Sequence, residues 1–240
     1  MAAASDTQGF HGFSPKLFEF YDGLAANQSR DWFQAHKAEY ETQVRAPLVA
    51  LVEALSFAFA AHDIPLQGDP KRSMFRIYRD VRFSNNKAPY KTNASAVLSR
   101  DGAKSAKGIF YFHIGGPERE VFAAMGFYGP EPEDLAALRQ AIAQSPDRWL
   151  AAVSALEQAG LGLVRDSALS RMPKGFEAQA ETPAAADLKL RNLIVTRRFD
   201  AQAIHQPELV EDLVAFAADG LPLLEFGWRA LAARPGPQRG

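Results

Sequence analysis

The feature that most constrains the fold is a change in the spacing of apolar residues along the chain. Before about residue 74 the apolar side chains recur every three to four positions, which is the spacing of one helix face. From Met74 to Tyr128 they recur at every second position, and helical spacing returns after Gly129. Helices, then strands, then helices predict an α+β fold: N-terminal helices, a central antiparallel β-meander over about residues 74–128, and C-terminal helices.

The alternating region divides into segments that end in turn-forming residues such as Ser-Asn-Asn and Gly-Gly-Pro. The connections are too short for parallel crossovers, so neighbouring strands should be antiparallel. The strands expected in the meander span about Phe75–Phe83, Lys91–Ser99, Gly108–Ile114 and Val121–Phe127. One further strand is expected near residues 193–199, where the sequence is LIVTRRF.

Helix boundaries before the meander are indicated by capping residues and proline. Ser14 and Pro15 should begin the first helix, and Ser29 should cap the second. Pro47 is expected to end the second helix and to open a third, which would run from Leu48 to about Ala61.

The chain of 240 residues is expected to form a single α+β domain over residues 13–233, with a disordered N-terminus at 1–12 and a disordered tail at 234–240. It has no cysteine, which suits a reducing compartment, and its first residues lack the basic and apolar regions of a signal peptide. No apolar run approaches the ~18 residues of a membrane span. We therefore expect a cytoplasmic protein that does not interact with membranes.

Positive charge is concentrated in the first half of the meander. Between Pro70 and Lys107 there are ten Lys and Arg against two Asp, a local charge of +8, although the net charge of the whole chain is -1. A generally basic nucleic-acid-binding surface is therefore disfavoured, and any affinity for anions should be local.

The sequence RIYRDVRFSNNKAPYKT, residues 76–92, carries five of these cations. In an extended strand Arg79 would share a face with apolar residues such as Ile77 and Val81, whereas Arg76 and Arg82 would lie on the opposite face with Asp80. An arginine on an apolar face is costly unless its guanidinium is hydrogen-bonded. We therefore expect Asp80 to orient Arg82, and we interpret Arg79 as the member with a structural role.

The same segment resembles the signature of the domain-of-unknown-function 2461 family, which is bacterial and also occurs in fungi. The resemblance rests on this pattern: Arg76-x-x-Arg79-Asp80-x-Arg82-Phe83-x-x-x-Lys87-x-x-Tyr90, with Asn86 directly before the lysine. Segments around Asp31-Trp32-Phe33 and Arg171–Phe176 are also similar to family patterns, so the resemblance extends from about Phe13 to Leu231. It implies that the segment is important, and it supplies no reaction.

The first functional hypothesis is a binding module whose cationic sheet face holds an anionic small molecule. Arg76 and Arg82 would donate forked hydrogen bonds, Lys87 and Lys91 would act as point charges, and Tyr90 would donate its hydroxyl or stack. The expected ligand-binding residues are Arg76, Arg79, Asp80, Arg82, Lys87, Tyr90 and Lys91.

Two alternatives remain open. The chain could be an enzyme acting on an anionic substrate, with Tyr90, Lys87 or His113 as acid or base. It could instead be an interaction domain in which the Arg and Asp residues form an internal ion-pair network. The sequence has no phosphate loop, dinucleotide fingerprint or metal-ligand motif, so no cofactor and no metal are expected. Other residues could join the site if the fold brings them there: Lys37, His113, Lys174, Arg197 and Arg198.

Overall fold

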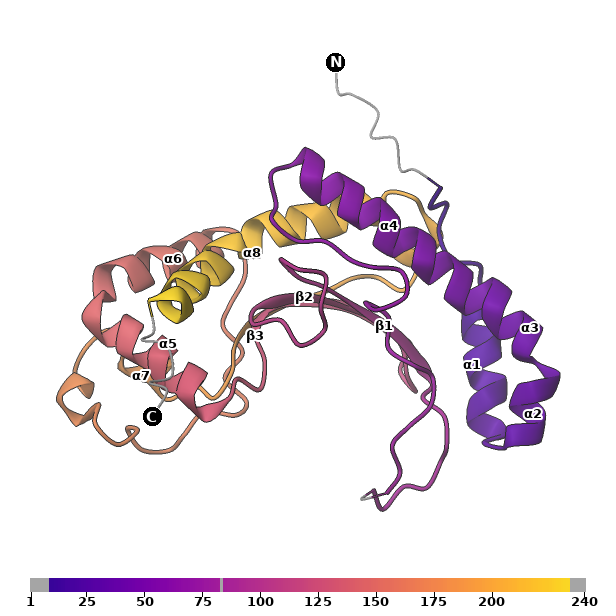
Figure 1. Cartoon of the computed structure of the whole chain (residues 1–240), viewed down its shortest axis with the longest axis horizontal. Coiled ribbons are helices and arrows are strands. Elements are labelled where there is room, and N and C mark those ends of the chain that lie inside the picture. Colours follow the sequence, from indigo (N-terminus) through magenta and orange to yellow (C-terminus); the bar gives the residue numbers. More distant parts are fainter. Residues whose placement is uncertain (1–8, 83, 234–240) are drawn as a thin grey trace, which may run out of the picture. The chain divides into compact units, whose positions relative to one another are not determined.

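The computed structural model describes residues 9–82 and 84–233 (Figure 1). Helices lie at both ends of the chain and a four-stranded antiparallel sheet lies between them, in the strand order β1-β2-β3-β4. The α+β fold predicted from the sequence is confirmed. The strands are β1 (Asn93–Leu98), β2 (Ile109–Gly115), β3 (Glu120–Phe127) and β4 (Leu193–Arg198).

The contacts within the chain define two compact units, where the sequence predicted one domain over residues 13–233. Unit 1 comprises residues 1–106, 110–123 and 197–216, and unit 2 comprises residues 107–109, 124–196 and 217–240. Most of the residues predicted to be disordered, 1–8 and 234–240, lie outside the described part of the chain. Within the predicted N-terminal range, Phe10 is buried, with 1% of its surface exposed.

Unit 1 contains the N-terminal helices and β1. The helical segments are α1 (Lys16–Ala26), α2 (Arg30–Ala35), α3 (Lys37–Glu39), the π-helical turn Tyr40–Arg45 and α4 (Ala46–Ala61). As expected, Ser29 caps α2, and its Oγ accepts a hydrogen bond from the backbone N–H of Trp32. The alternation of β2 places Phe110 and Phe112 on one face of the sheet, and Phe110 contacts the rings of Phe59 and Phe216.

The expectation that Pro47 ends a helix is wrong, because the chain stays helical from Lys37 to Ala61. Proline has no N–H to donate to the preceding turn, and the π-helical turn immediately before α4 accommodates this interruption. By length and composition the continuous stretch could span a membrane, contrary to the expectation from the sequence. Core helices of soluble proteins meet the same criterion, and Leu51, Leu55 and Phe59 of α4 are buried within unit 1.

Unit 2 is built around a buried tryptophan. Its helices are α5 (Pro132–Gln144), α6 (Pro146–Gln158), the 3₁₀ turn Glu177–Gln179, α7 (Ala185–Leu188) and the C-terminal part of α8 (Leu209–Ala232). Trp149 is fully buried, contacts Phe226, and donates its indole N–H to Asp187 at 2.8 Å. Arg165 also donates to Asp187, at 2.7 Å, so this nearly buried carboxylate is paired.

The first strand predicted for the meander is not a strand. Ser73–Phe75 run antiparallel to β1 through hydrogen bonds such as Phe75 N–H to the Ser95 carbonyl, but beyond Phe75 the chain leaves β1, and residues 77–79 pair with residues 89–91 instead. Beyond this pairing, Asp80 Oδ1 accepts the backbone N–H of Arg82, and Asn86 Oδ1 accepts that of Ala88. Such side-chain bonds compete with a strand ladder, and the described part of residues 76–92, here called the motif loop, is an irregular hairpin; Phe83 of the predicted strand lies outside the described residues.

Candidate functional site

The base of the motif loop is held by backbone pairing and by an aromatic stack. Arg79 N–H donates to the Pro89 carbonyl and Lys91 N–H donates to the Ile77 carbonyl, at 2.9 and 2.7 Å. The Tyr90 ring stacks on Phe33 of α2 with the ring centroids 4.6 Å apart. The two ends of the hairpin are therefore fixed against the N-terminal helices.

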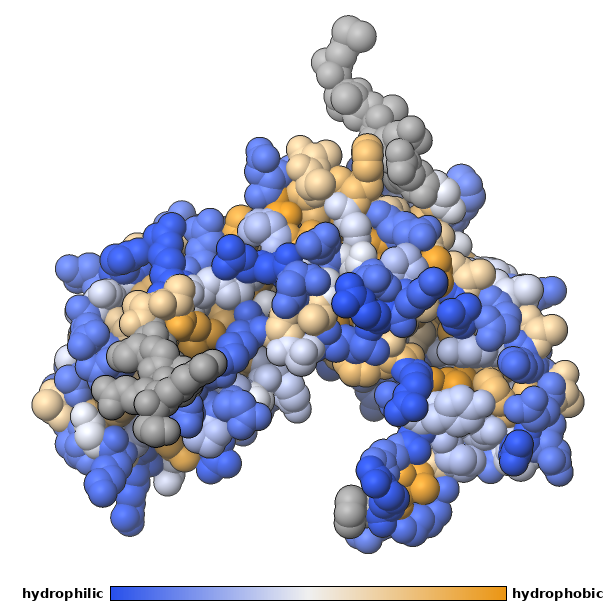
Figure 2. Space-filling view, in the orientation of Figure 1, coloured by the Kyte–Doolittle hydropathy of each residue, from blue (hydrophilic) through white to orange (hydrophobic). Residues whose placement is uncertain are grey.

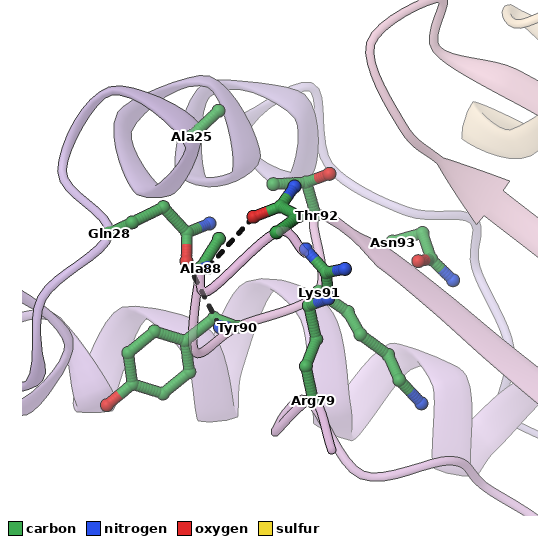
Figure 3. Close-up of a pocket in the computed structure, with 9 residues that line it drawn as sticks. Ala25, Gln28, Arg79, Ala88, Tyr90, Lys91, Thr92 and Asn93 are labelled. Atoms are coloured by element: carbon green, nitrogen blue, oxygen red, sulfur yellow. Dashed lines mark hydrogen bonds between the residues drawn. The ribbon is translucent and has the colours of Figure 1, made fainter. Parts of the chain in front are cut away.

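A pocket of about 310 Å³ lies between this base, the start of β1 and the α1–α2 connection (Figure 3). Gln28 is positioned there because its Oε1 accepts the backbone N–H of Tyr90 at 3.1 Å. Its other amide atom, Nε2, is a donor. The lining residues are Ala25, Gln28, Arg79, Asn86, Ala88, Tyr90, Lys91, Thr92 and Asn93.

Arg79 is the most informative residue of the pocket. Its side chain is half-buried, and Figure 3 shows it extended alongside the backbone of Lys91. Within residues 9–82 and 84–233, no side chain or carbonyl accepts a hydrogen bond from its guanidinium. The pocket lining contains no carboxylate. A partly buried cation without an acceptor is unfavourable, so the pocket is suited to an anion.

Lys91 lines the pocket, and its ammonium lies 5.3 Å from the centre of the Phe75 ring. Burial lowers the pKa of Lys91, and the nearby charges of Lys104 and Arg76 lower it further. Lys104 shows the same effect, because burial and then Arg76 lower its pKa. Three cations therefore lie near one another, and one of them, Lys91, lines the pocket.

The other arginine at the centre of the motif is engaged elsewhere. Arg82 donates to both carboxylate oxygens of Asp80, at 3.0 and 2.7 Å, as the sequence suggested. The side chains are 77% and 60% exposed, so this pair is solvated and does not form a buried network. Hydrogen bonds from Arg82 are the main reason that the pKa of Asp80 is lowered. The described tip of the motif loop is largely hydrophilic (Figure 2).

Of the seven residues predicted to bind a ligand, Arg79, Tyr90 and Lys91 line the pocket. Lys87 is exposed and donates to the Val81 carbonyl at 3.0 Å, and Arg76 is exposed and does not line the pocket. The Tyr90 ring is packed on Phe33, so its backbone and not its ring faces the pocket (Figure 3).

The five additional residues considered from the sequence do not line the pocket. Within unit 1, Arg197 lies over the Phe216 ring and Arg198 pairs with Glu120 at 2.8 Å. Lys37 is exposed on α3, and Lys174 belongs to unit 2. His113 is half-buried on β2, where its Nδ1 lies 3.5 Å from the amide nitrogen of Asn93.

Sequence reasoning missed the neutral polar residues of the pocket. Gln28 comes from the turn before α2, sixty-two positions from its partner Tyr90, and no local pattern indicates this approach. Asn93 was expected only as part of a strand. Its role could have been inferred from its position at the point where the motif loop joins β1.

The sequence matches the model of a known family over residues 16–226, which is most of the chain. The family is described as a conserved hypothetical protein, DUF2461. The chain belongs to the DUF2461 family. The resemblance predicted from the motif is thus confirmed, and membership in DUF2461 assigns no reaction or ligand. Comparison with curated proteins and with solved structures gave no significant match.

Proposed function

We propose that this DUF2461 protein binds a phosphate- or carboxylate-bearing small molecule in the pocket at the base of the motif loop. The observation that carries the proposal is the half-buried guanidinium of Arg79, which has no acceptor among the described residues and faces a lining without carboxylates. Arginine presents a planar fork of donors that matches two oxygens of such a group.

The neutral side chains of the pocket support the same ligand class. Gln28 holds its acceptor oxygen on the Tyr90 N–H, which leaves its amide N–H₂ to donate to a ligand. Thr92 and Asn93 add a hydroxyl and an amide to the lining. An anion bound at Arg79 would therefore find uncharged donors around it, and the nearby ammonium groups of Lys91 and Lys104 would add attraction.

A thermal-shift screen of phosphate and carboxylate metabolites tests the proposal. A compound at a hundredfold excess over its Kd stabilises the folded chain by about 2.7 kcal/mol. Calorimetry of any hit should then show much weaker binding to Arg79→Gln and nearly unchanged binding to Arg82→Gln. The two arginines belong to one loop, but only Arg79 lines the pocket, so Arg82 is the matched control. Binding that survives Arg79→Gln would overturn the assignment.

A second candidate function is catalysis by Lys91. A lysine whose pKa is lowered has a larger fraction of neutral amine, which can act as a base or nucleophile. This candidate requires that a hit from the screen be chemically converted, which can be followed by NMR. Conversion should be lost in Lys91→Met while binding at Arg79 persists. A hit that is bound but never converted would eliminate catalysis by Lys91 as a function.

A further inference from the structure

A row of ring side chains lies on the face of the sheet opposite Phe110 and Phe112. We call it the aromatic row. It is formed by Phe75, which pairs with β1, by Tyr111 and His113 of β2, and by Phe122 of β3. His113 stacks on Phe122 with the centroids 4.7 Å apart, Tyr111 lies 5.9 Å from Phe122, and Phe75 lies 6.1 Å from Tyr111. All four are partly accessible, and Phe75 is 37% exposed.

The aromatic row is continuous with the pocket at two points. Asn93 lines the pocket, lies on the same face of the sheet as Tyr111 and His113, and approaches the His113 ring. Lys91 also lines the pocket and places its ammonium over the Phe75 ring. A ligand whose anionic group occupies the pocket could therefore extend a second group along the row.

The chemistry of the row favours a flat, uncharged group. Burial lowers the pKa of His113, although the Glu120 carboxylate opposes this effect, and the lowered pKa favours the uncharged imidazole. Its stacked arrangement with Phe122 offers ring faces and edges, and nucleobases stack on such side chains regardless of sequence. Lys104 holds its ammonium 5.1 Å from the Phe75 ring through a hydrogen bond to the Met74 carbonyl, which keeps a cation beside the row.

We propose that the pocket and the aromatic row form one site for a single nucleoside monophosphate, with the phosphate at Arg79 and the base against the row. This inference rests on the proposed function and specifies its ligand class. The surface suits one nucleotide better than a nucleic-acid strand, because the whole chain is not basic. In addition, the Glu120 carboxylate, paired with Arg198, lies next to Phe122 on β3 and interrupts the positive surface.

The test compares AMP and UMP with ribose 5-phosphate, which has the same phosphate and sugar without a base. If the base stacks on the row, the wild-type chain should bind a nucleotide about 5- to 150-fold more tightly than ribose 5-phosphate in calorimetry. Phe122→Leu and Phe75→Leu should each reduce this ratio and leave the Kd of ribose 5-phosphate unchanged. Phe57→Leu, at an exposed phenylalanine of α4, is the control that should change neither value.

The outcomes separate this inference from the proposed function. Suppose that ribose 5-phosphate binds in an Arg79-dependent way. If the nucleotides then bind no more tightly than ribose 5-phosphate, or bind more tightly even in both row variants, only the nucleotide inference is overturned. If none of these compounds binds, the nucleotide inference is overturned, whereas the proposed function fails only if the wider screen of phosphate and carboxylate metabolites also gives no Arg79-dependent binding. A 5′-phosphorylated tetranucleotide that binds more than tenfold more tightly than AMP would also overturn the single-nucleotide assignment.

Discussion

Phe33 is the residue on which the position of the motif loop most depends. It is 2% exposed, its ring stacks on Tyr90 at 4.6 Å, and it also contacts Tyr40 and Tyr78 at 5.6 and 5.9 Å. Phe33→Ala removes a buried ring from the centre of this cluster. Truncation of a buried phenylalanine costs about 3–5 kcal/mol through lost transfer free energy and the cavity that remains.

We expect the full cost at Phe33, because three tyrosine rings lose a partner at once and aromatic pairs contribute about 0.5–1.5 kcal/mol each beyond buried area. The free energy of unfolding should therefore fall by about 3–5 kcal/mol, measured in urea titrations that follow NMR signals of residues in unit 1. Protection of the Tyr90 N–H from hydrogen exchange should fall too, because Gln28 holds that N–H only while the loop is docked.

Phe57→Ala provides the matched control. Phe57 lies on α4 and is 49% exposed, so this substitution makes the same chemical change at the surface. It should alter the free energy of unfolding by about 0.5 kcal/mol or less. A loss below about 1 kcal/mol for Phe33→Ala, or equal losses for the two variants, would refute the conclusion that the aromatic stack anchors the loop.

Three further predictions concern the rest of the chain. Burial raises the pKa of Tyr40 from 10.0 to about 12, so the stability that un-ionised Tyr40 contributes should be constant below pH 10 and should be lost at up to about 1.4 kcal/mol per pH unit between 10 and 12, because only the unfolded state ionises this group there; in alkaline denaturation the stability of Tyr40→Phe should fall less steeply than that of the wild type. Asp187→Ala leaves the buried Trp149 N–H unpaired and should lower the free energy of unfolding by about 1–3 kcal/mol in urea titrations. In the double variant with Trp149→Phe the total loss should be smaller than the sum of the two single losses, and equal values would contradict this. Gly126→Ala should lower stability by roughly 4 kcal/mol or more, because φ is +135° and a Cβ would overlap the Leu193 carbonyl oxygen; a normal melting curve would contradict it.

The sheet could be predicted where the hydrophobic pattern and the turns agree. β2 and β3 lie within about one residue of their predicted limits because alternating apolar residues on them bury one face. The segment Phe75–Phe83 also alternates, and Ile77 is indeed buried while Tyr78 and Asp80 are exposed. It fails as a strand of the sheet because beyond Phe75 it leaves β1 and pairs only with residues 89–91, and side-chain bonds replace backbone pairing after Arg79; alternation alone does not indicate this change of partner.

The sequence could locate the candidate site, but it could not assign the role of each residue in it. Parity indicated that Arg79 is less exposed than Arg76 and Arg82, which the structure confirms. The interpretation of Arg79 as structural requires an acceptor, and none is present among the described residues. The stacking of Tyr90 on Phe33 and the approach of Gln28 are contacts between distant parts of the chain, so the sequence could not indicate which arginine faces the pocket.

The most direct test of the central claim is the melting temperature of Arg79→Met, measured without and with ribose 5-phosphate. If Arg79 is retained for an anion, the variant without ligand should melt at or above the wild-type temperature, because an unpaired cation has been replaced by an apolar side chain of similar length. Ribose 5-phosphate should then stabilise only the wild-type chain. A variant that melts below wild type without ligand, or that is stabilised equally by the ligand, would contradict the claim.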